Sequence, residues 1–121
     1  MRYNVDERYE AVVITLKGDV LGGPEGAELH DRLRELRDEG KNQIVVDLSK
    51  AKFMNSGGLG MLVSAMTTAR NAGGDLRFAN VADRIESLLM VTKLLTVFKE
   101  YDSVDEAAQS YETNPPASNG E

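Results

Sequence analysis

The chain has 121 residues, 41% of them hydrophobic, which is typical of one globular domain. Its formal net charge of −6 makes nucleic acid a poor partner, because an acidic surface repels phosphate backbones, and the absence of cysteine excludes disulfides and thiolate metal sites. Since the N-terminus lacks the apolar run of a signal peptide and no stretch approaches the ~20 apolar residues of a membrane span, we expect a cytoplasmic protein with no direct membrane insertion.

The chain is expected to begin with two strands and a helix. Residues 3–20 alternate apolar and polar side chains, which predicts two strands joined near residues 7–9. Residues 21–41 carry leucines at helical spacing. Pro24 is a favourable first helical residue and Gly40 a favourable stop, so this segment predicts an amphipathic helix.

The rest of the chain is expected to alternate between strands and helices. Apolar runs and helical spacing predict, in chain order, a strand at 42–49, a helix at 57–71, a strand at 75–80, a helix at 81–95, a short edge strand at 96–101 and a helix at 103–111. The last helix opens with Ser103 and Glu106, which form a capping box. Residues 112–121 are polar and rich in proline, so we expect a disordered tail.

These elements predict a single α/β domain over residues 1–111. Their order is β-β-α-β-α-β-α-(β)-α, and strand–helix–strand units imply right-handed crossovers. We therefore expect a mixed β-sheet of four to five strands that is covered by about four helices.

The stretch FMNSGGLG, residues 53–60, places a lone hydroxyl at a strand-to-helix turn. The simplest interpretation makes Ser56 the N-cap of the next helix, a role that contributes about 1 kcal/mol. Gly57 and Gly58 then fall in the first turn, where glycine weakens a helix. We therefore predict that they leave backbone N–H groups open to a ligand or a partner. A helix N-terminus attracts phosphate, so this turn can bind an anion or carry one covalently on Ser56.

Other chemistries fit the sequence less well. A nucleophile elbow needs glycine two residues before the serine, where Met54 stands. The single histidine, His30, lies on a charged helix and is expected to be solvated, which argues against a Ser–His–acid triad. Asp47 is expected to hydrogen-bond to its own turn. An enzyme or nucleotide-binding module built on residues 57–60 is the third interpretation, but the glycines lack the lysine of a P-loop and the dinucleotide spacing. We expect no enzyme activity, cofactor or metal.

The region from Val12 to Tyr111 resembles the STAS domain, the fold of bacterial anti-sigma factor antagonists and of the cytoplasmic end of sulfate transporters. The family pattern is a strand ending in DLS, a hydrophobic turn, and a serine–glycine run before a helix. It stands here as Asp47, Leu48, Ser49, Phe53, Asn55, Ser56, Gly57, Gly58, Leu59 and Gly60. The later runs GGDLRFANV, LLMVTKLLTVF and YDSVDEA also fit the family.

The resemblance implies a stand-alone anti-sigma factor antagonist that is switched by phosphorylation. In soluble members a GHKL-type serine kinase, which is also the anti-sigma factor, phosphorylates the serine at the position of Ser56. The unphosphorylated antagonist captures that kinase and frees the sigma factor, whereas the phosphorylated form lets go and a serine phosphatase resets it. The implied partner-binding residues are Leu21, Gly22, Asn55, Ser56, Gly57, Gly58, Leu59, Gly60 and Met61. We expect a monomer or a weak dimer.

Two positions depart from the family pattern and keep alternatives open. Asn55 stands where the family usually has Asp, and Leu21 stands where a second acid often follows the second strand. Both changes remove negative charge beside Ser56, so they alter kinase recognition or make Ser56 a docking residue that is not phosphorylated. An accessory subunit of an ABC-type lipid transporter is an alternative with the same fold and a different partner.

Overall fold

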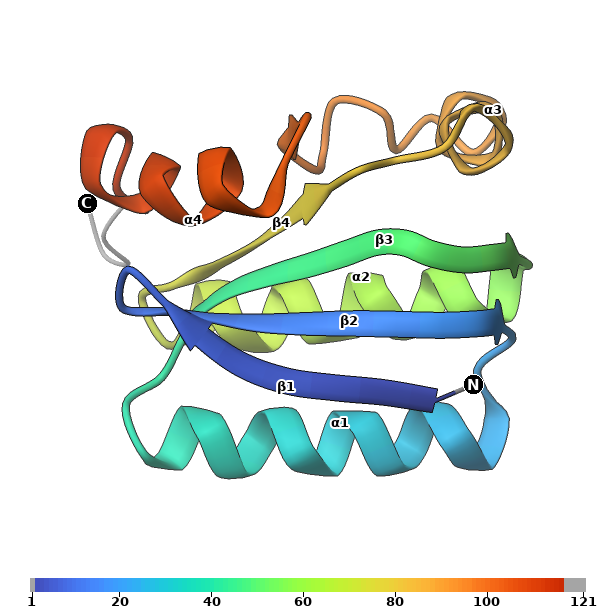
Figure 1. Cartoon of the computed structure of the whole chain (residues 1–121). Coiled ribbons are helices and arrows are strands. Elements are labelled where there is room, and N and C mark those ends of the chain that lie inside the picture. Colours follow the sequence, from blue (N-terminus) through green and yellow to red (C-terminus); the bar gives the residue numbers. More distant parts are fainter. Residues whose placement is uncertain (1, 117–121) are drawn as a thin grey trace.

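The computed structural model describes residues 2–116, which form a five-stranded sheet and four helices (Figure 1). In chain order the elements are β1 (Arg2–Arg8), β2 (Ala11–Val20), α1 (Gly23–Asp38), β3 (Gln43–Met54), α2 (Ser56–Asn71), β4 (Asp75–Ala79), α3 (Asp83–Val91), β5 (Glu100–Tyr101) and α4 (Val104–Thr113). The expected fold class and element order are confirmed.

The sheet is mixed and its strands lie in the order β1-β2-β3-β4-β5. β1 is antiparallel to β2, and each of the other neighbouring pairs is parallel. Tyr9 and Glu10 connect β1 to β2, and both have positive φ, as a two-residue type I′ hairpin requires. Because β2, β3 and β4 are parallel, β2 and β3 end at the same edge of the sheet, and α2 begins there.

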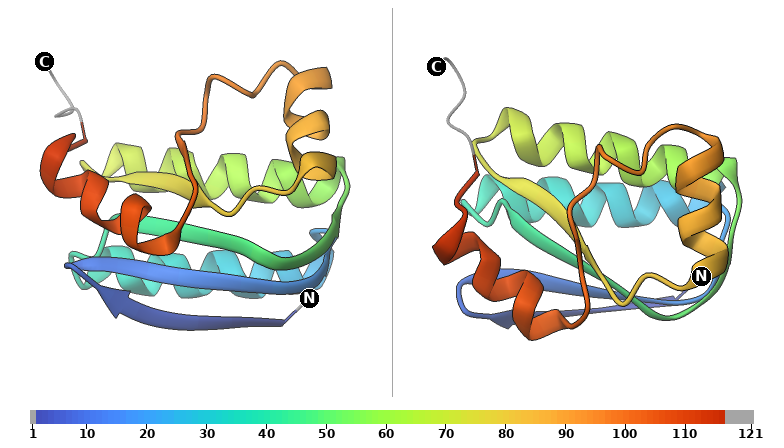
Figure 2. Two further views of the ribbon diagram at one scale, coloured as in Figure 1. Left: turned by 45° about the horizontal axis from the view of Figure 1, so that its top comes forward. Right: turned by 90° about the horizontal axis from the view of Figure 1, so that it is seen from above.

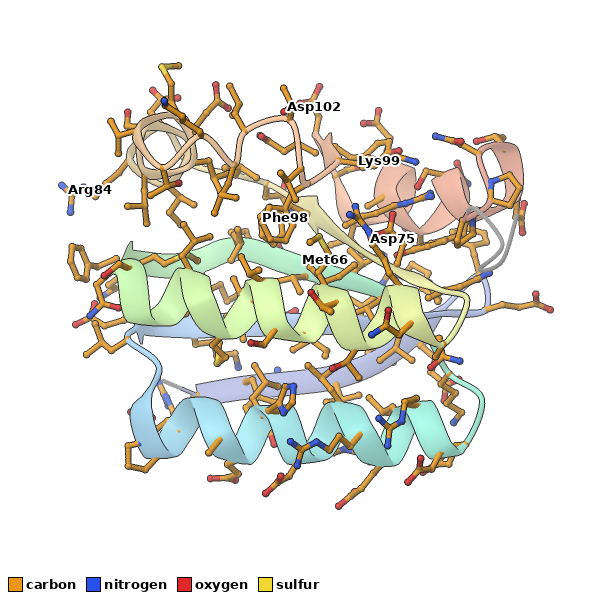
Figure 3. The ribbon with its side chains drawn as sticks, turned by 180° about the vertical axis from the view of Figure 1, so that it is seen from behind. Met66, Asp75, Arg84, Phe98, Lys99 and Asp102 are labelled. Carbon is orange, nitrogen blue, oxygen red and sulfur yellow. The ribbon has the colours of Figure 1, made fainter. Side chains whose placement is uncertain are left out.

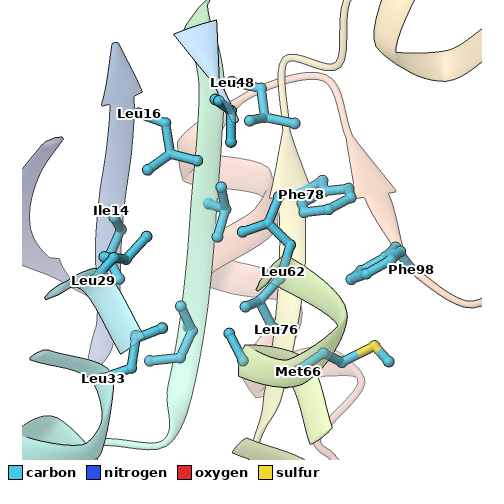
Figure 4. Packing of buried hydrophobic residues seen from close by; sticks show 14 of the residues in the cluster. Ile14, Leu16, Leu29, Leu33, Leu48, Leu62, Met66, Leu76, Phe78 and Phe98 are labelled. Atoms are coloured by element: carbon cyan, nitrogen blue, oxygen red, sulfur yellow. The ribbon is translucent and has the colours of Figure 1, made fainter. Parts of the chain in front are cut away.

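The helices cover the two faces of the sheet unequally (Figure 2). α1 and α2 lie on one face, α3 packs into the same core, and α4 covers part of the other face. The larger core is built from alternating residues of the strands and the buried stripes of these helices, including Ile14, Leu62 and Phe78 (Figure 4). Phe78 stacks on Phe98 with ring centroids 4.4 Å apart. The core therefore fixes α2, and with it the turn that carries Ser56.

β3 is longer than the sequence pattern predicts. The register between β2 and β3 shifts twice, between Thr15 and Lys17 and between Gly18 and Asp19. At each shift β3 holds one extra residue, and such bulges break the alternation by which a strand is recognised. The strand was therefore expected to end at residue 49, whereas it continues to Met54 and delivers the chain directly to α2.

Two other boundaries differ from expectation. α3 ends at Val91, and residues 92–95 form turns and irregular chain in place of further helix. α4 continues through Thr113, two residues into the expected tail, and residues 117–121 of that tail lie outside the described residues. Within residues 2–116, no helix has both the length and the apolar character that a bilayer crossing requires.

Candidate functional site

Asn55 is the N-cap of α2. Its Oδ1 accepts a hydrogen bond from the backbone N–H of Gly58 at 2.8 Å, and its own N–H donates to the carbonyl of Val20 at 3.3 Å. Asn55 also has the extended backbone of a cap, with φ −104° and ψ −179°. The expectation that Ser56 is the cap is therefore wrong by one residue, and Ser56 is the first residue of the helix.

The Ser56 side chain is exposed to solvent. Within residues 2–116, its hydroxyl has no hydrogen-bond partner. The first turn of α2 contains no acidic residue, so no negative side chain there competes for the positive end of the helix dipole. The hydroxyl is therefore accessible, and its surroundings favour an anion.

The glycines at the start of α2 let this helix pack against the end of β2. A Cβ on Gly57 would lie 2.7 Å from the carbonyl oxygen of Leu21, and one on Gly58 would lie 2.0 Å from that of Val20. Gly22, with φ +78°, approaches from the other side, since a Cβ there would lie 2.8 Å from the Gly57 oxygen. The expectation that these glycines expose backbone to a partner is therefore wrong for Gly58, which is buried by this contact.

The structure brings the expected partner-binding residues together at one edge of the sheet. Leu21 is 45% exposed, and its carbonyl faces Gly57. Gly60 is exposed and Met61 is half-buried. Gly58 and Leu59 need correction, because both are buried and cannot offer a surface to a partner; Leu59 is only 3% exposed.

A groove with a volume of about 280 Å³ runs between α1 and α2, next to the Ser56 turn. The two helices lie side by side on this face of the sheet (Figure 3). Gly22, Gly26 and Gly60 help to line it, together with His30 and Met61. His30 is half-buried, not fully solvated as expected. The groove is continuous with the Ser56 turn because Gly22 and Gly57 lie at its end.

Asp47 of β3 makes side-chain hydrogen bonds to β2 and to the residue that follows β4. Its Oδ1 accepts from the backbone N–H of Ser49 at 3.0 Å, which is the local bond that the sequence predicted. The same oxygen accepts from Asn80 Nδ2 at 3.0 Å, and Oδ2 accepts from the hydroxyl of Thr15 at 3.4 Å. Among the residues that the structure describes, no group of three or more His, Asp or Glu side chains is placed to hold a metal ion.

A buried ion-pair network under α4 was missed by the sequence analysis. The fully buried Arg77 donates to Asp75 Oδ2 at 3.1 Å, to Ser110 Oγ at 2.8 Å and to the Asn114 carbonyl at 2.7 Å. Its guanidinium also lies 4.1 Å from the centre of the Tyr111 ring. Charged residues at alternate positions of the strand DLRFA were the available signal. These contacts attach the C-terminal half of α4 to the sheet.

Asp75 is shared between two arginines in this network. Arg70 of α2 donates to Asp75 Oδ1 at 2.8 Å. Burial by itself would raise the pKa of Asp75, but the hydrogen bonds from Arg70, Arg77 and the Leu76 N–H outweigh it, and the pKa is lowered. Burial raises the pKa of Tyr111, whose hydroxyl lies 2.6 Å from the Ile44 carbonyl oxygen. The network is thus structural and distant from Ser56.

The STAS domain family model matches residues 2–107. The chain belongs to the STAS domain family. A TM1081 homolog of Thermotoga neapolitana, provisionally named an anti-sigma factor antagonist, is 29% identical over 75 residues, which are 62% of this STAS chain and 66% of that protein. The anti-sigma-B factor antagonist of Staphylococcus aureus (strain NCTC 8325 / PS 47) is 33% identical over 67 residues, 55% of this chain and 62% of that protein. The match thus spans just under two thirds of each relative.

Two solved structures share the STAS fold of this chain. SpoIIAA, an anti-sigma factor antagonist, in its unphosphorylated form aligns with a TM-score of 0.70 and 17% identity, covering 93% of this chain and 99% of that one. The phosphorylated form of the Bacillus cell fate determinant SpoIIAA aligns with a TM-score of 0.69 and 18% identity, covering 88% of this chain and 96% of that one. At these identities the likeness shows the fold.

Proposed function

We propose that this STAS protein is a bacterial anti-sigma factor antagonist that binds a GHKL-type serine kinase, the anti-sigma factor, and releases it when Ser56 is phosphorylated. The observation that carries this proposal is the exposed Ser56 hydroxyl at the first residue of α2, with no partner in the described chain. The names of the Thermotoga and Staphylococcus relatives support the class of function. The switch operates in the cytoplasm, and a serine phosphatase resets it.

A phosphate on Ser56 is compatible with the fold. Because Asn55 already caps the N–H of Gly58, the helix keeps its cap when Ser56 is modified. An anion near a helix N-terminus is favourable by about 0.3–1 kcal/mol at an exposed position, and the first turn holds no acid to oppose it. SpoIIAA, which shares this fold, has been solved in both forms, which supports the same tolerance here.

Phosphorylation acts on the docking surface more than on the fold. It adds about −1.5 to −2 charges at pH 7 to a turn whose exposed neighbours, Leu21, Gly57 and Gly60, carry no charge. A partner packed on this turn would have to remove the phosphate from water without offering it a counter-charge, and burying an unpaired charge is strongly unfavourable. The phosphorylated form therefore releases its partner.

The test is co-purification from the native host with mass spectrometry of Ser56. We expect the wild-type protein and Ser56→Ala to capture a GHKL-type kinase, whereas Ser56→Asp captures much less of it. A phosphopeptide containing Ser56 is expected from the wild type. Equal capture by all three proteins would show that Ser56 is not the switch.

Two other results would identify the alternatives. Capture of an ABC ATPase in place of a kinase would identify an accessory subunit of a lipid transporter. Capture of a kinase that never phosphorylates Ser56 would identify a docking module without a phosphorylation switch, and would assign the difference to Asn55 and Leu21.

A further inference from the structure

We propose that an uncharged, apolar ridge of the kinase docks on an apolar surface of this chain. Leu21, Phe53 and the groove between α1 and α2 form that surface. This inference rests on the proposed function and specifies the chemistry of its partner. We call this region the docking surface.

Two exposed hydrophobic side chains flank the Ser56 turn. Leu21 is 45% exposed and Phe53 is 41% exposed, and they belong to a group of only five large hydrophobic residues exposed in the described chain. Phe53 precedes the turn in β3, and the carbonyl of Leu21 faces Gly57. Exposed apolar patches mark protein–protein interaction sites, so we expect a partner to cover Leu21 and Phe53 together with the adjoining groove.

The docking surface carries very little charge. Residues 53–69, which span the end of β3 and most of α2, contain no Asp, Glu, Lys or Arg, although these residues make up 28% of the chain. The lining of the groove includes one titratable side chain, His30. The nearest charges along the strands are those of Lys52 and Asp19, which are both exposed. Asp19 of β2 lies opposite Phe53 of β3 in the sheet.

The lack of charge on the docking surface favours an uncharged partner segment. A charged segment seated here would lose its water without gaining a counter-charge, whereas an uncharged apolar segment would bury Leu21 and Phe53. The net charge of −6 is compatible with a basic partner surface, but the residues that form the docking surface, Leu21, Phe53 and the lining of the groove, include no acid. The groove, at about 280 Å³, is slightly smaller than the roughly 300–1,000 Å³ of small-molecule pockets, and it suits side chains of a protein ridge.

The test compares two equivalent substitutions at opposite ends of the sheet. Leu21→Asp introduces an acid on the docking surface, and Tyr9→Asp introduces the same acid at the β1–β2 hairpin, where Tyr9 is 46% exposed and Asp tolerates the positive φ (Figure 1). The probe is the purified GHKL-type kinase of the native host. We expect Leu21→Asp to raise Kd by about tenfold or more, and Tyr9→Asp to change it by less than about twofold. The wild-type Kd is expected to change little between low and high salt, because salt screens only charges.

Phe53→Ser provides a second, independent variant, and thermal melting shows that each variant is folded. Wild-type affinity in both Leu21→Asp and Phe53→Ser, or a steep loss of wild-type affinity in high salt, would overturn the inference. Ser56→Asp in the same assay separates the two proposals. If Ser56→Asp weakens binding while Leu21→Asp and Phe53→Ser do not, the docking surface is wrong and the proposed function stands. If the kinase does not bind the wild type, both proposals fail.

Discussion

Replacing Gly58 with alanine tests why α2 begins with glycines. The new Cβ would lie 2.0 Å from the carbonyl oxygen of Val20 and 2.6 Å from its carbonyl carbon. Both atoms are backbone and cannot rotate aside, so the start of α2 has to move away from β2. Such overpacking costs about 1–3 kcal/mol. The shift also weakens the Asn55 cap, which contributes about 1 kcal/mol. The better helix propensity of alanine returns only about 0.5–1 kcal/mol.

We therefore expect Gly58→Ala to lower the free energy of unfolding by about 2–3 kcal/mol and Tm by roughly 10 °C for a domain of this size. Gly60→Ala is the matched control in the same helix, because a Cβ there would meet no atom within 4 Å. It should stabilise the protein by about 0.5–1 kcal/mol. Thermal and urea unfolding followed by circular dichroism measure both. Equal stability of Gly58→Ala and wild type, or equal losses in the two variants, would refute the close contact between α2 and β2.

Two further predictions concern hydrogen bonds that the structure assigns. Asn55→Ala should lose about 1 kcal/mol in urea unfolding, whereas Asn55→Asp should keep the cap and gain up to about 1 kcal/mol from the helix dipole; equal losses in both would contradict the cap. Asp75→Asn should destabilise the protein at neutral pH. Since folding lowers the pKa of Asp75, its stabilisation is present above the ordinary carboxyl pKa, near 4, and is lost as the pH falls through the folded pKa. Urea unfolding should therefore show the deficit of Asp75→Asn shrinking below about pH 4, and a constant deficit would contradict the assignment.

The sequence predicts those parts of the fold that depend on local pattern. Pro24 lies in the first turn of α1, and Gly40 follows its end with φ +79°. Ser103 accepts from the N–H of Glu106 at 3.1 Å, as the capping box predicted. These features need only neighbouring residues, so they can be read from a short stretch of sequence.

The parts that sequence could not predict depend on contacts between distant segments. Asn55 and Ser56 are adjacent residues of equal cap preference, and only the path of β3 decides between them. The role of Gly58 depends on the position of Val20 in β2, which no local pattern gives. Arg77 is satisfied by Asn114, 37 residues away, so its burial follows from the docking of α4.

The measurement that tests the central claim most directly is the affinity of the purified GHKL-type kinase for the same STAS protein before and after phosphorylation. The kinase and ATP prepare the phosphorylated protein, mass spectrometry confirms a single phosphate on Ser56, and calorimetry gives both Kd values. We expect the phosphorylated form to bind at least about tenfold more weakly, a difference of about 1.4 kcal/mol or more, while its Tm stays close to that of the unmodified protein. Equal affinities, or a phosphate located on a residue other than Ser56, would contradict it.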